Sequence, residues 1–297
     1  TASDDLTGNL VEGDECLRRA LHRGIFPEPD GLIAEQNRAD RYPQIAQTVA
    51  SSLPGSSAGG EQPKFLTSIM DSAGERHPVL VKFSPAMNQA TGQRWADLLL
   101  CEYHAHLTLA DAGWTSPGAR ILDAEGRRFL EVPRFDRTPQ AGRRGLVSLD
   151  AIHPESIGYD NGGWPKAAAE MVQEGLLEST GLETIRRLHA FGELIGNADM
   201  HAGNLSFWLD DNLPLRVAPA YDMLPMLWAP GPQGEIMARR FSPAPPLPAS
   251  ITAWREAASL ASSFWDRVTA DPRLSGNFQE IAKSAAATLT QLRSHVG

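Results

Sequence analysis

The sequence has few cysteines and no long hydrophobic run. Cys16 and Cys101 are the two cysteines in 297 residues, and neither has a CxxC or Cys/His neighbour. The sequence therefore encodes neither a disulfide framework nor a structural zinc site. No apolar run reaches the roughly 18 to 20 residues that span a bilayer, and the polar, acidic first fifteen residues do not resemble a signal peptide. We expect a cytoplasmic protein without direct membrane contact.

Basic residues are too few for a broad nucleic-acid-binding surface. The chain has 27 Lys and Arg against 36 Asp and Glu, a formal net charge of −9 at pH 7. Non-specific binding to nucleic acid depends on Lys and Arg that neutralise phosphates, so the composition gives no strong signal for direct nucleic-acid binding. The hydrophobic share of 42% is close to that of folded globular proteins. The length predicts two domains or lobes.

The first half of the chain has the pattern of a small β-sheet with one long helix. Apolar runs at residues 65–70 and 78–83 flank a polar turn, which predicts a β-hairpin, and a second hairpin pattern follows around DAEG. Between the hairpins, apolar residues at helical spacing predict an amphipathic helix over residues 95–112 that ends at Gly113.

The second half is mostly helical by the spacing of its apolar residues. Helices are predicted over residues 166–177, 182–195, 251–267 and 277–295. Residues 228–248 are crowded with Pro and Gly, which predicts an extended loop. We therefore expect a mixed α/β chain of the α+β type, with a β-rich N-lobe over residues 1–132 and a mostly helical C-lobe over residues 133–297.

A glycine-rich loop precedes the first predicted hairpin. Its sequence, SSAGGEQPK, spans residues 56–64. Small residues let backbone N–H groups approach phosphate oxygens. The candidates for this contact are Ser57, Ala58, Gly59 and Gly60. A flexible connection into the hairpin is the structural alternative.

Two charged residues are candidates for an ion pair near that loop. Lys82 lies in the next apolar run, from which a lysine can reach the same phosphates as a point charge. Glu102 lies near the middle of the predicted helix and is a candidate partner for Lys82. Alternatively, Lys82 extends from a strand edge into solvent and Glu102 lies on a solvated helix face.

The segment GNADMHAGN, residues 196–204, is the sharpest motif. Asp199 and Asn204 have the D-x-x-x-x-N spacing of the protein-kinase catalytic loop, where the aspartate accepts the substrate hydroxyl proton and the asparagine binds Mg²⁺. Asp222, at the end of a predicted strand, is the candidate for a second magnesium ligand. Asp199 and Asn204 are also common turn formers. A metal hydrolase that uses Asp199, His201 and Asp222 is a weaker alternative, because no H-x-x-x-H or H-x-H cluster accompanies them.

At these residues the sequence resembles the HipA family, the serine/threonine kinases of bacterial type II toxin–antitoxin systems. The matching segments are SSAGGEQPK, VKF, CEYHAHLTLADAG, RFDR, GNADMHAGN and AYDM, and the GGEQPK form of the loop is most similar to the shorter HipH branch. The resemblance implies a two-lobed protein-kinase-like fold and transfer of the γ-phosphoryl group of ATP, with Mg²⁺, to a serine or threonine.

The resemblance also implies a role for each motif residue. Asp199 is the catalytic base, Asn204 and Asp222 are the magnesium ligands, Lys82 contacts the ATP phosphates, and His201 supports the catalytic loop.

A hinge and a modification site follow from the same resemblance. Val132, Arg134 and Phe135 belong to the hinge that receives adenine, although Pro133 lacks the backbone N–H that such a hinge uses. Ser57, with Ser56 beside it, is the expected site of autophosphorylation.

The resemblance further implies partners. These are a DNA-binding antitoxin and a protein substrate, which we expect to be an aminoacyl-tRNA synthetase or another translation component. Residues 228–248 follow Asp222, so this loop is the candidate for acceptor recognition. HipA has an N-terminal subdomain that does not fit before residue 51, so the chain belongs to a compact branch or to a longer protein. A catalytically weak kinase-fold binding module and a small-molecule phosphotransferase remain as alternatives.

Overall fold

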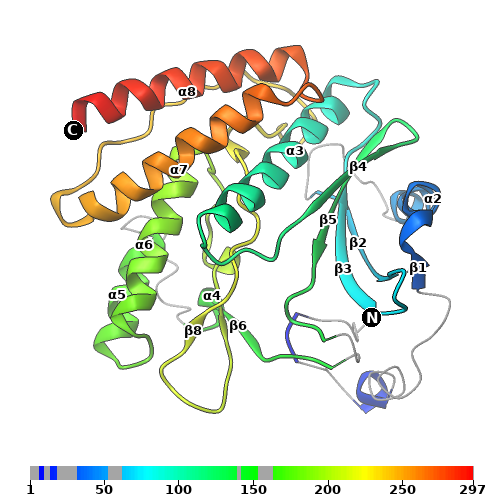
Figure 1. The fold of residues 1–297 in the computed structure, drawn as a ribbon, viewed down its shortest axis with the longest axis horizontal. Coiled ribbons are helices and arrows are strands. Elements are labelled where there is room, and N and C mark those ends of the chain that lie inside the picture. The colour runs from blue at the N-terminus through cyan, green and yellow to red at the C-terminus, as the bar shows by residue number, and fades with distance from the viewer. Residues whose placement is uncertain are drawn as a thin grey trace.

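The computed structural model describes residues 7–9, 14–18, 32–52, 62–138, 142–152 and 163–296. A twisted β-sheet forms one side of the molecule and a group of helices forms the other, with helix α3 between them (Figure 1). Among the described residues, no helix is both long enough and apolar enough to cross a membrane.

Five strands form the main sheet, in the order β1-β2-β3-β5-β4. They are β1 (Leu32–Ala34), β2 (Lys64–Met70), β3 (Arg76–Phe83), β4 (Arg120–Ala124) and β5 (Arg127–Pro133). β1 pairs with β2 in parallel and every other pair is antiparallel, so both predicted hairpins are confirmed. Glu125 and Gly126, both with positive φ, make the tight turn between β4 and β5.

The two faces of the sheet bury different side chains. Phe65, Val81 and Phe83 point to the face that α2 (Arg38–Ser52) covers, and Tyr42 packs there. Because side chains alternate along a strand, Lys82 points to the opposite face, toward α3. Lys64 stands directly opposite Lys82 in the β2–β3 register, so both lysines share that face.

Helix α3 (Ala90–Asp111) is buried along almost its whole length and contributes to two cores. Leu99 packs with residues of β5, whereas Leu98 and Cys101 pack with the helices. The helix begins five residues before the predicted start at residue 95. The first turn is formed by backbone bonds that apolar spacing does not reveal, such as the Gln93 N–H to the Gln89 carbonyl, and Gly92 has no Cβ to clash with the nearby Ala86 carbonyl.

Four long helices form the other side of the molecule: α5 (Gly163–Gln173), α6 (Ser179–Leu194), α7 (Ile251–Ala270) and α8 (Gly276–Val296). A short helix α4 (Leu149–Ile152) and a small sheet of β6 (Leu146–Ser148), β7 (Ser206–Trp208) and β8 (Arg216–Val217) lie beside them. The predicted long loop is also present. It has no helix or strand between single 3₁₀ turns at Met226–Trp228 and Pro248–Ser250.

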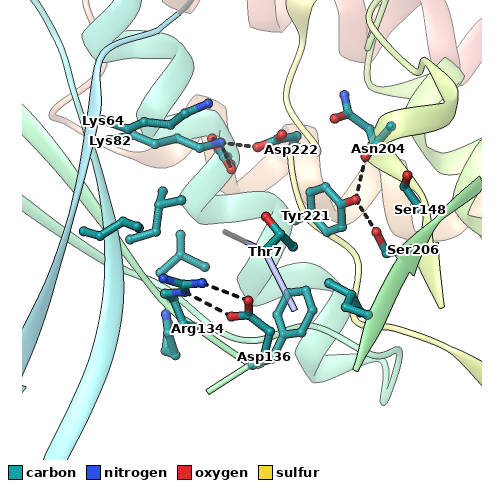
Figure 2. Close-up of a pocket in the computed structure, with 18 of the residues that line it drawn as sticks. Thr7, Lys64, Lys82, Arg134, Asp136, Ser148, Asn204, Ser206, Tyr221 and Asp222 are labelled. Atoms are coloured by element: carbon teal, nitrogen blue, oxygen red, sulfur yellow. Dashed lines mark hydrogen bonds and ion pairs between the residues drawn. The ribbon is translucent and has the colours of Figure 1, made fainter. Parts of the chain in front are cut away.

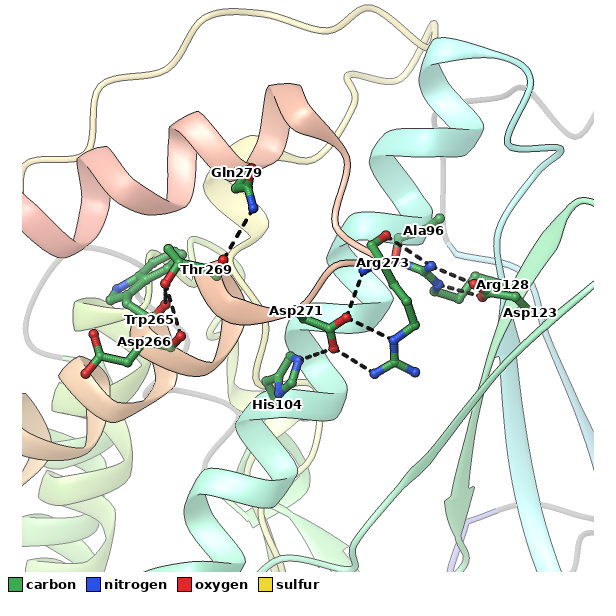
Figure 3. Close-up of polar contacts among 10 residues, drawn as sticks. All are labelled: Ala96, His104, Asp123, Arg128, Trp265, Asp266, Thr269, Asp271, Arg273 and Gln279. Carbon is green, nitrogen blue, oxygen red and sulfur yellow. Dashed lines mark hydrogen bonds and ion pairs between the residues drawn. The ribbon is translucent and has the colours of Figure 1, made fainter.

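Buried polar contacts join the sheet to the helices, as Figure 3 shows. The Arg128 guanidinium in β5 donates two hydrogen bonds to Asp123, one to the Ala96 carbonyl in α3 and one to the Arg273 carbonyl after α7. Asp271 accepts from Arg273 and bonds His104 of α3 at 2.9 Å. These contacts fix α3, and therefore Glu102, against both halves of the molecule.

Candidate functional site

A buried ion pair lies where β3 faces α3. The Lys82 Nζ atom is 2.6 Å from Glu102 Oε1 and 2.8 Å from Oε2, and the two residues are 9% and 1% exposed. Strand alternation aims Lys82 at α3, and the polar contacts described above hold α3 in place. The predicted pairing of Lys82 with Glu102 is therefore present in the structure.

Asp222 makes a second ion pair with Lys82. It has φ of +54°, a conformation that is uncommon outside glycine, and the Asn197 side-chain amide donates to its carbonyl at 3.0 Å. Burial alone lowers the pKa of Lys82, but the negative charges of Asp222 and Glu102 outweigh burial and raise this pKa above its ordinary value. Lys82 is therefore a fixed positive charge.

The loop after α6 holds the D-x-x-x-x-N pair through its own hydrogen bonds. The Asp199 N–H donates to Asn197 Oδ1 at 3.1 Å, and the Asn204 side-chain amide donates to the Asp199 carbonyl at 2.9 Å. The carboxylate of Asp199 and the oxygen of the Asn204 side chain take no part in these bonds. His201 accepts from the Gly203 N–H through Nδ1 at 3.1 Å, and its own carbonyl accepts from the Trp164 indole at 3.0 Å.

Tyr221, the residue directly before Asp222, supports the same loop through its side chain. Its hydroxyl donates to the Gly203 carbonyl at 2.7 Å and also bonds the Ser206 hydroxyl. Burial raises the pKa of Tyr221 to about 12, so the phenol keeps its proton and remains a donor.

Two adjoining cavities meet at these residues. The larger has a volume of about 760 Å³ and extends to Val132, Arg134 and Phe135. The smaller, of about 470 Å³, contains Asp199 and His201 in its wall. Four residues line both cavities: Lys64, Lys82, Asn204 and Asp222. Figure 2 shows Lys64 and Lys82 projecting side by side toward Asp222, with Asn204 across from them.

The hinge residues lie at the far end of the larger cavity, and few of their backbone donors are free. Pro133 has no N–H, and the Arg134 N–H donates to the Pro78 carbonyl at 2.9 Å. The Arg134 side chain, in the wall of the cavity, donates two hydrogen bonds to Asp136. The Phe135 ring packs against Tyr221, with ring centroids 6.1 Å apart.

The residues present fit a nucleotide with Mg²⁺. Asp222 offers carboxylate oxygens, and the bonded Asn204 Nδ2 leaves the amide oxygen of Asn204 as the available atom. Such oxygens are the ligands that Mg²⁺ prefers. Lys64 and Lys82 stand directly opposite each other on adjacent strands and both line the cavity, so they offer two ammonium groups to the phosphates of a nucleotide. A volume of about 760 Å³ is ample for a nucleoside triphosphate.

The structure brings together most of the residues that the sequence singles out, in two groups. Lys82, Glu102, Asn204, Asp222 and the hinge residues line the larger cavity, whereas Asp199 and His201 line the smaller one. The glycine-rich loop residues Ser56, Ser57, Ala58, Gly59 and Gly60 lie outside the described residues.

Three further residues of this site received no role from the sequence. Lys64 ends the SSAGGEQPK motif, and its register opposite Lys82 is the signal that assigns it to the cavity. Asn197 lies inside the GNADMHAGN motif and links its backbone to Asp222. Nothing in the sequence points to Tyr221 beyond its place next to Asp222.

Comparisons with known proteins bear on this site. The family model described as HipA-like C-terminal domain matches residues 56–292. Toxin YjjJ of Escherichia coli (strain K12) is 39% identical over 294 residues, which are 98% of this chain. The chain spans 65% of the length of that relative.

Two solved structures resemble the fold. HipA of Shewanella oneidensis MR-1, in a complex with HipB and operator DNA, aligns with a TM-score of 0.56 and 16% identity over 85% of this chain and 70% of HipA. The Helicobacter pylori proinflammatory kinase CtkA aligns with a TM-score of 0.50 and 14% identity over 77% of this chain and 90% of CtkA. The fold is therefore kinase-like.

Proposed function

Because the chain belongs to the HipA-like C-terminal domain family, we propose that it is an ATP-dependent serine/threonine protein kinase that acts as a HipA-type toxin. The observation that carries the proposal is the pair of adjoining cavities that share Lys64, Lys82, Asn204 and Asp222. In this proposal the larger cavity binds the nucleotide and the smaller one binds the hydroxyl group that accepts the phosphate. The four shared residues surround the phosphoryl group as it moves from the nucleotide to the acceptor.

Each residue has a role in this proposal. Lys82, which Glu102 holds in place, binds the phosphates of the nucleotide, and Lys64 beside it adds a second positive charge. Asp199, in the wall of the acceptor cavity, orients the substrate hydroxyl and accepts its proton. The hydroxyl oxygen bonds to the γ-phosphorus of ATP while the bond from that phosphorus to the β–γ bridging oxygen breaks, so ADP is the leaving group.

Asn204 and Asp222 are the residues that hold Mg²⁺ in this proposal. When bound, the ion neutralises charge on the β- and γ-phosphates. Asn197 and Tyr221 position these two ligands through hydrogen bonds to the backbone. His201 supports the loop through its bond from the Gly203 N–H.

The lobes and partners are part of the same proposal. The N-lobe comprises residues 1–132 and the C-lobe residues 133–297, with the nucleotide between them. The substrate is a cytoplasmic protein, with an aminoacyl-tRNA synthetase or another translation component as the expected target. HipA of Shewanella oneidensis forms a complex with HipB and operator DNA, which supports a DNA-binding antitoxin as a partner. Ser57, with Ser56 beside it, is the proposed site of autophosphorylation.

One observation favours a second candidate function, that of a kinase-fold module that binds a partner and transfers little phosphate. The hinge lacks the Pro133 N–H, and the Arg134 N–H is taken by Pro78. A hinge with few free donors binds adenine weakly. Transfer of phosphate, rather than nucleotide binding, distinguishes the two functions.

The test is phosphoryl transfer from γ-labelled ATP with Mg²⁺, followed by mapping of the labelled peptides. We expect label on Ser57 or Ser56 in the wild type. An Asp199→Asn variant should lose the label, by about 10²-fold or more, and keep its nucleotide affinity, because Asp199 lies outside the nucleotide cavity.

An Asp210→Asn variant is the matched control, since Asp210 is an exposed aspartate paired with Arg216 on the surface. It should label like the wild type. Transfer by Asp199→Asn at the wild-type rate contradicts the role of Asp199. An unlabelled wild type whose loop serines are unmodified at the start supports the binding module instead.

A further inference from the structure

An N-terminal segment of the chain is attached to the hinge, more than 120 residues away in sequence. The Gly8 N–H donates to Asp136 Oδ2 at 2.8 Å, and the Gly8 carbonyl accepts from Arg137 at 2.7 Å. Asp136 is 5% exposed and also receives two hydrogen bonds from Arg134. The segment is therefore bonded through both of its backbone groups to the residues that follow the hinge.

The attachment depends on the charge of Asp136 and on the lack of a side chain at Gly8. Burial alone raises the pKa of Asp136, but hydrogen bonds and charge from Arg134, the Gly8 N–H and Arg137 outweigh burial and hold the pKa below its ordinary value. Gly8 has φ of +72°, and a Cβ there would lie 3.0 Å from the backbone nitrogen of Leu146. Any side chain here would be strained by the positive φ and would require Leu146 to shift, so glycine suits this position.

The attachment brings Thr7 into the wall of the larger cavity. Figure 2 shows Thr7 in the cavity among residues from the hinge, the small sheet and the Asp222 segment. With Thr7 in place the cavity still measures about 760 Å³, so the segment lines the cavity without filling it. Residues 7–9 also lie outside residues 56–292, which the family model matches.

We propose that residues 7–9 form part of the nucleotide site, with the Thr7 hydroxyl as a hydrogen-bonding group for the nucleoside. The phosphates go to Lys82 and Lys64, because these two cations line both cavities together with Asn204 and Asp222, whereas the third cation of the wall, Arg134, is paired with Asp136. Thr7 is next to Gly8, and Gly8 is bonded to Asp136, which directly follows the hinge residues. Thr7 therefore lies at the hinge end of the cavity, where we place the sugar and the base. This inference rests on the proposed function, since it assigns a contact to the same nucleotide.

The first measurement is amide hydrogen exchange of the full chain, with and without a non-hydrolysable ATP analogue and Mg²⁺. We expect the nucleotide to protect residues 7–9 together with residues 62–83 and 132–138. Protection of the latter two regions without residues 7–9 overturns this inference and leaves the kinase intact. An absence of nucleotide-dependent protection anywhere overturns the proposed function and this inference with it.

The second measurement is the affinity for the same analogue by calorimetry. Thr7→Val removes the hydroxyl and keeps the shape, and should weaken binding by about 2- to 10-fold. Gly8→Ala should weaken it at least as much, because a Cβ at this positive φ is strained and lies only 3.0 Å from the Leu146 backbone, so the attachment of the segment shifts. Gly74→Ala is the matched control: Gly74 has φ of +80° in a distant turn, with nothing within 4 Å of the added Cβ. Equal affinities of Gly8→Ala and Gly74→Ala overturn the inference.

Discussion

The Lys82–Glu102 pair places two charges in an almost dry environment. Removing a carboxylate from water is unfavourable, and a buried pair offsets this cost only with good geometry. Here Lys82 makes two short contacts to Glu102 and a third to Asp222, and the ordinary Glu102 pKa of 4.5 falls to about 2. Burial acts against this shift, and the positive charge of Lys82 is the largest contribution in its favour.

A pH dependence of stability follows from that shift. The folded-state pKa of Glu102 is lowered, so its stabilising contribution is fully present above about pH 5 and is lost as the pH falls toward 2. Glu102→Gln should lower the free energy of unfolding at pH 7 by on the order of 2 kcal/mol. The difference from wild type should shrink on acidification from pH 5 to pH 3, as urea denaturation at each pH would measure.

Glu280→Gln provides the control for this experiment. Glu280 pairs with Lys283 on the surface with its side chain 74% exposed, and such a pair contributes little to stability. We expect its effect to be small at every pH. A Glu102→Gln deficit that stays constant from pH 7 to pH 3 would show that the loss comes from packing and not from the charge.

The sequence predicts the pairing of Lys82 with Glu102 but not the residues that support it. Lys82 and Asp199 lie in motifs whose residue types imply their chemistry. Lys64 and Asn197 lie in the same motifs, yet their importance depends on strand register and on backbone hydrogen bonds. Neither of these can be deduced from residue type alone.

Among the structural elements, the loop between α6 and β7 depends on one buried side chain. Asn197 accepts from the Asp199 N–H and donates to the Asp222 carbonyl, so it fixes the proposed base and the proposed metal-binding segment relative to each other. Asn197→Asp keeps the acceptor but replaces the donor with an oxygen that repels the Asp222 carbonyl. We expect phosphoryl transfer to fall by about 10- to 100-fold, mostly in kcat, as measured by steady-state labelling.

Asn212→Asp makes the same change in charge in an exposed turn and serves as the control. It should leave transfer unchanged. If Asn197→Asp changes KM for ATP and not kcat, Asn197 acts on nucleotide binding alone, and the proposed link between Asp199 and Asp222 is wrong.

Strand β5 depends on Arg128 for its attachment to the helices (Figure 3). This side chain is 2% exposed and bonds Asp123, Ala96 and Arg273. Arg128→Ala removes four hydrogen bonds, two of them to the Asp123 carboxylate, and should lower the free energy of unfolding by about 3 kcal/mol. Arg120→Ala on neighbouring β4, where the side chain is 61% exposed, should cost less than about 1 kcal/mol. Equal losses, measured by chemical denaturation, would contradict this role.

The long elements follow from apolar spacing, and the short ones do not. Helices α6, α7 and α8 bury one face each, so their periodicity predicts them. Strands β1 and β6 have three residues each, too few for a period, and they exist because β2 and β7 pair with them. Tertiary pairing decides such segments.

The loop between β8 and α7 that we expect to recognise the acceptor, residues 228–248, is anchored at two points. Trp228 is buried, and Phe241 packs on Trp228 and Trp265 beside Gly196 of the catalytic loop. Replacement of all of residues 228–248 would therefore remove core contacts as well as the exposed proline-rich part. Its role in acceptor recognition stays a prediction.

At the scale of the whole molecule, the proposed nucleotide site is built from segments that lie far apart in the sequence. β3 supplies Lys82, α3 supplies Glu102, and residues 7–9 reach the hinge from the start of the chain. The order of motifs along the sequence predicts a kinase-like arrangement. This order cannot predict that residues 7–9 pack against the hinge. That contact depends on the buried Asp136 and on Gly8, which fits against Leu146.

A ligand bound between the two halves of such a molecule stabilises both halves together. At about 100 times its dissociation constant, a ligand specific for the folded state adds about 2.7 kcal/mol, which for a chain of this length raises Tm by about 4 °C. We expect that shift with a non-hydrolysable ATP analogue and Mg²⁺ in differential scanning calorimetry. Asp222→Asn should reduce the part of the shift that EDTA abolishes, because it loses a ligand of the ion, whereas Asp199→Asn should keep the whole shift. If Asp199→Asn loses the ligand-induced rise in Tm, Asp199 takes part in nucleotide binding. The proposed division of roles, with the nucleotide in one cavity and the acceptor in the other, would then be wrong.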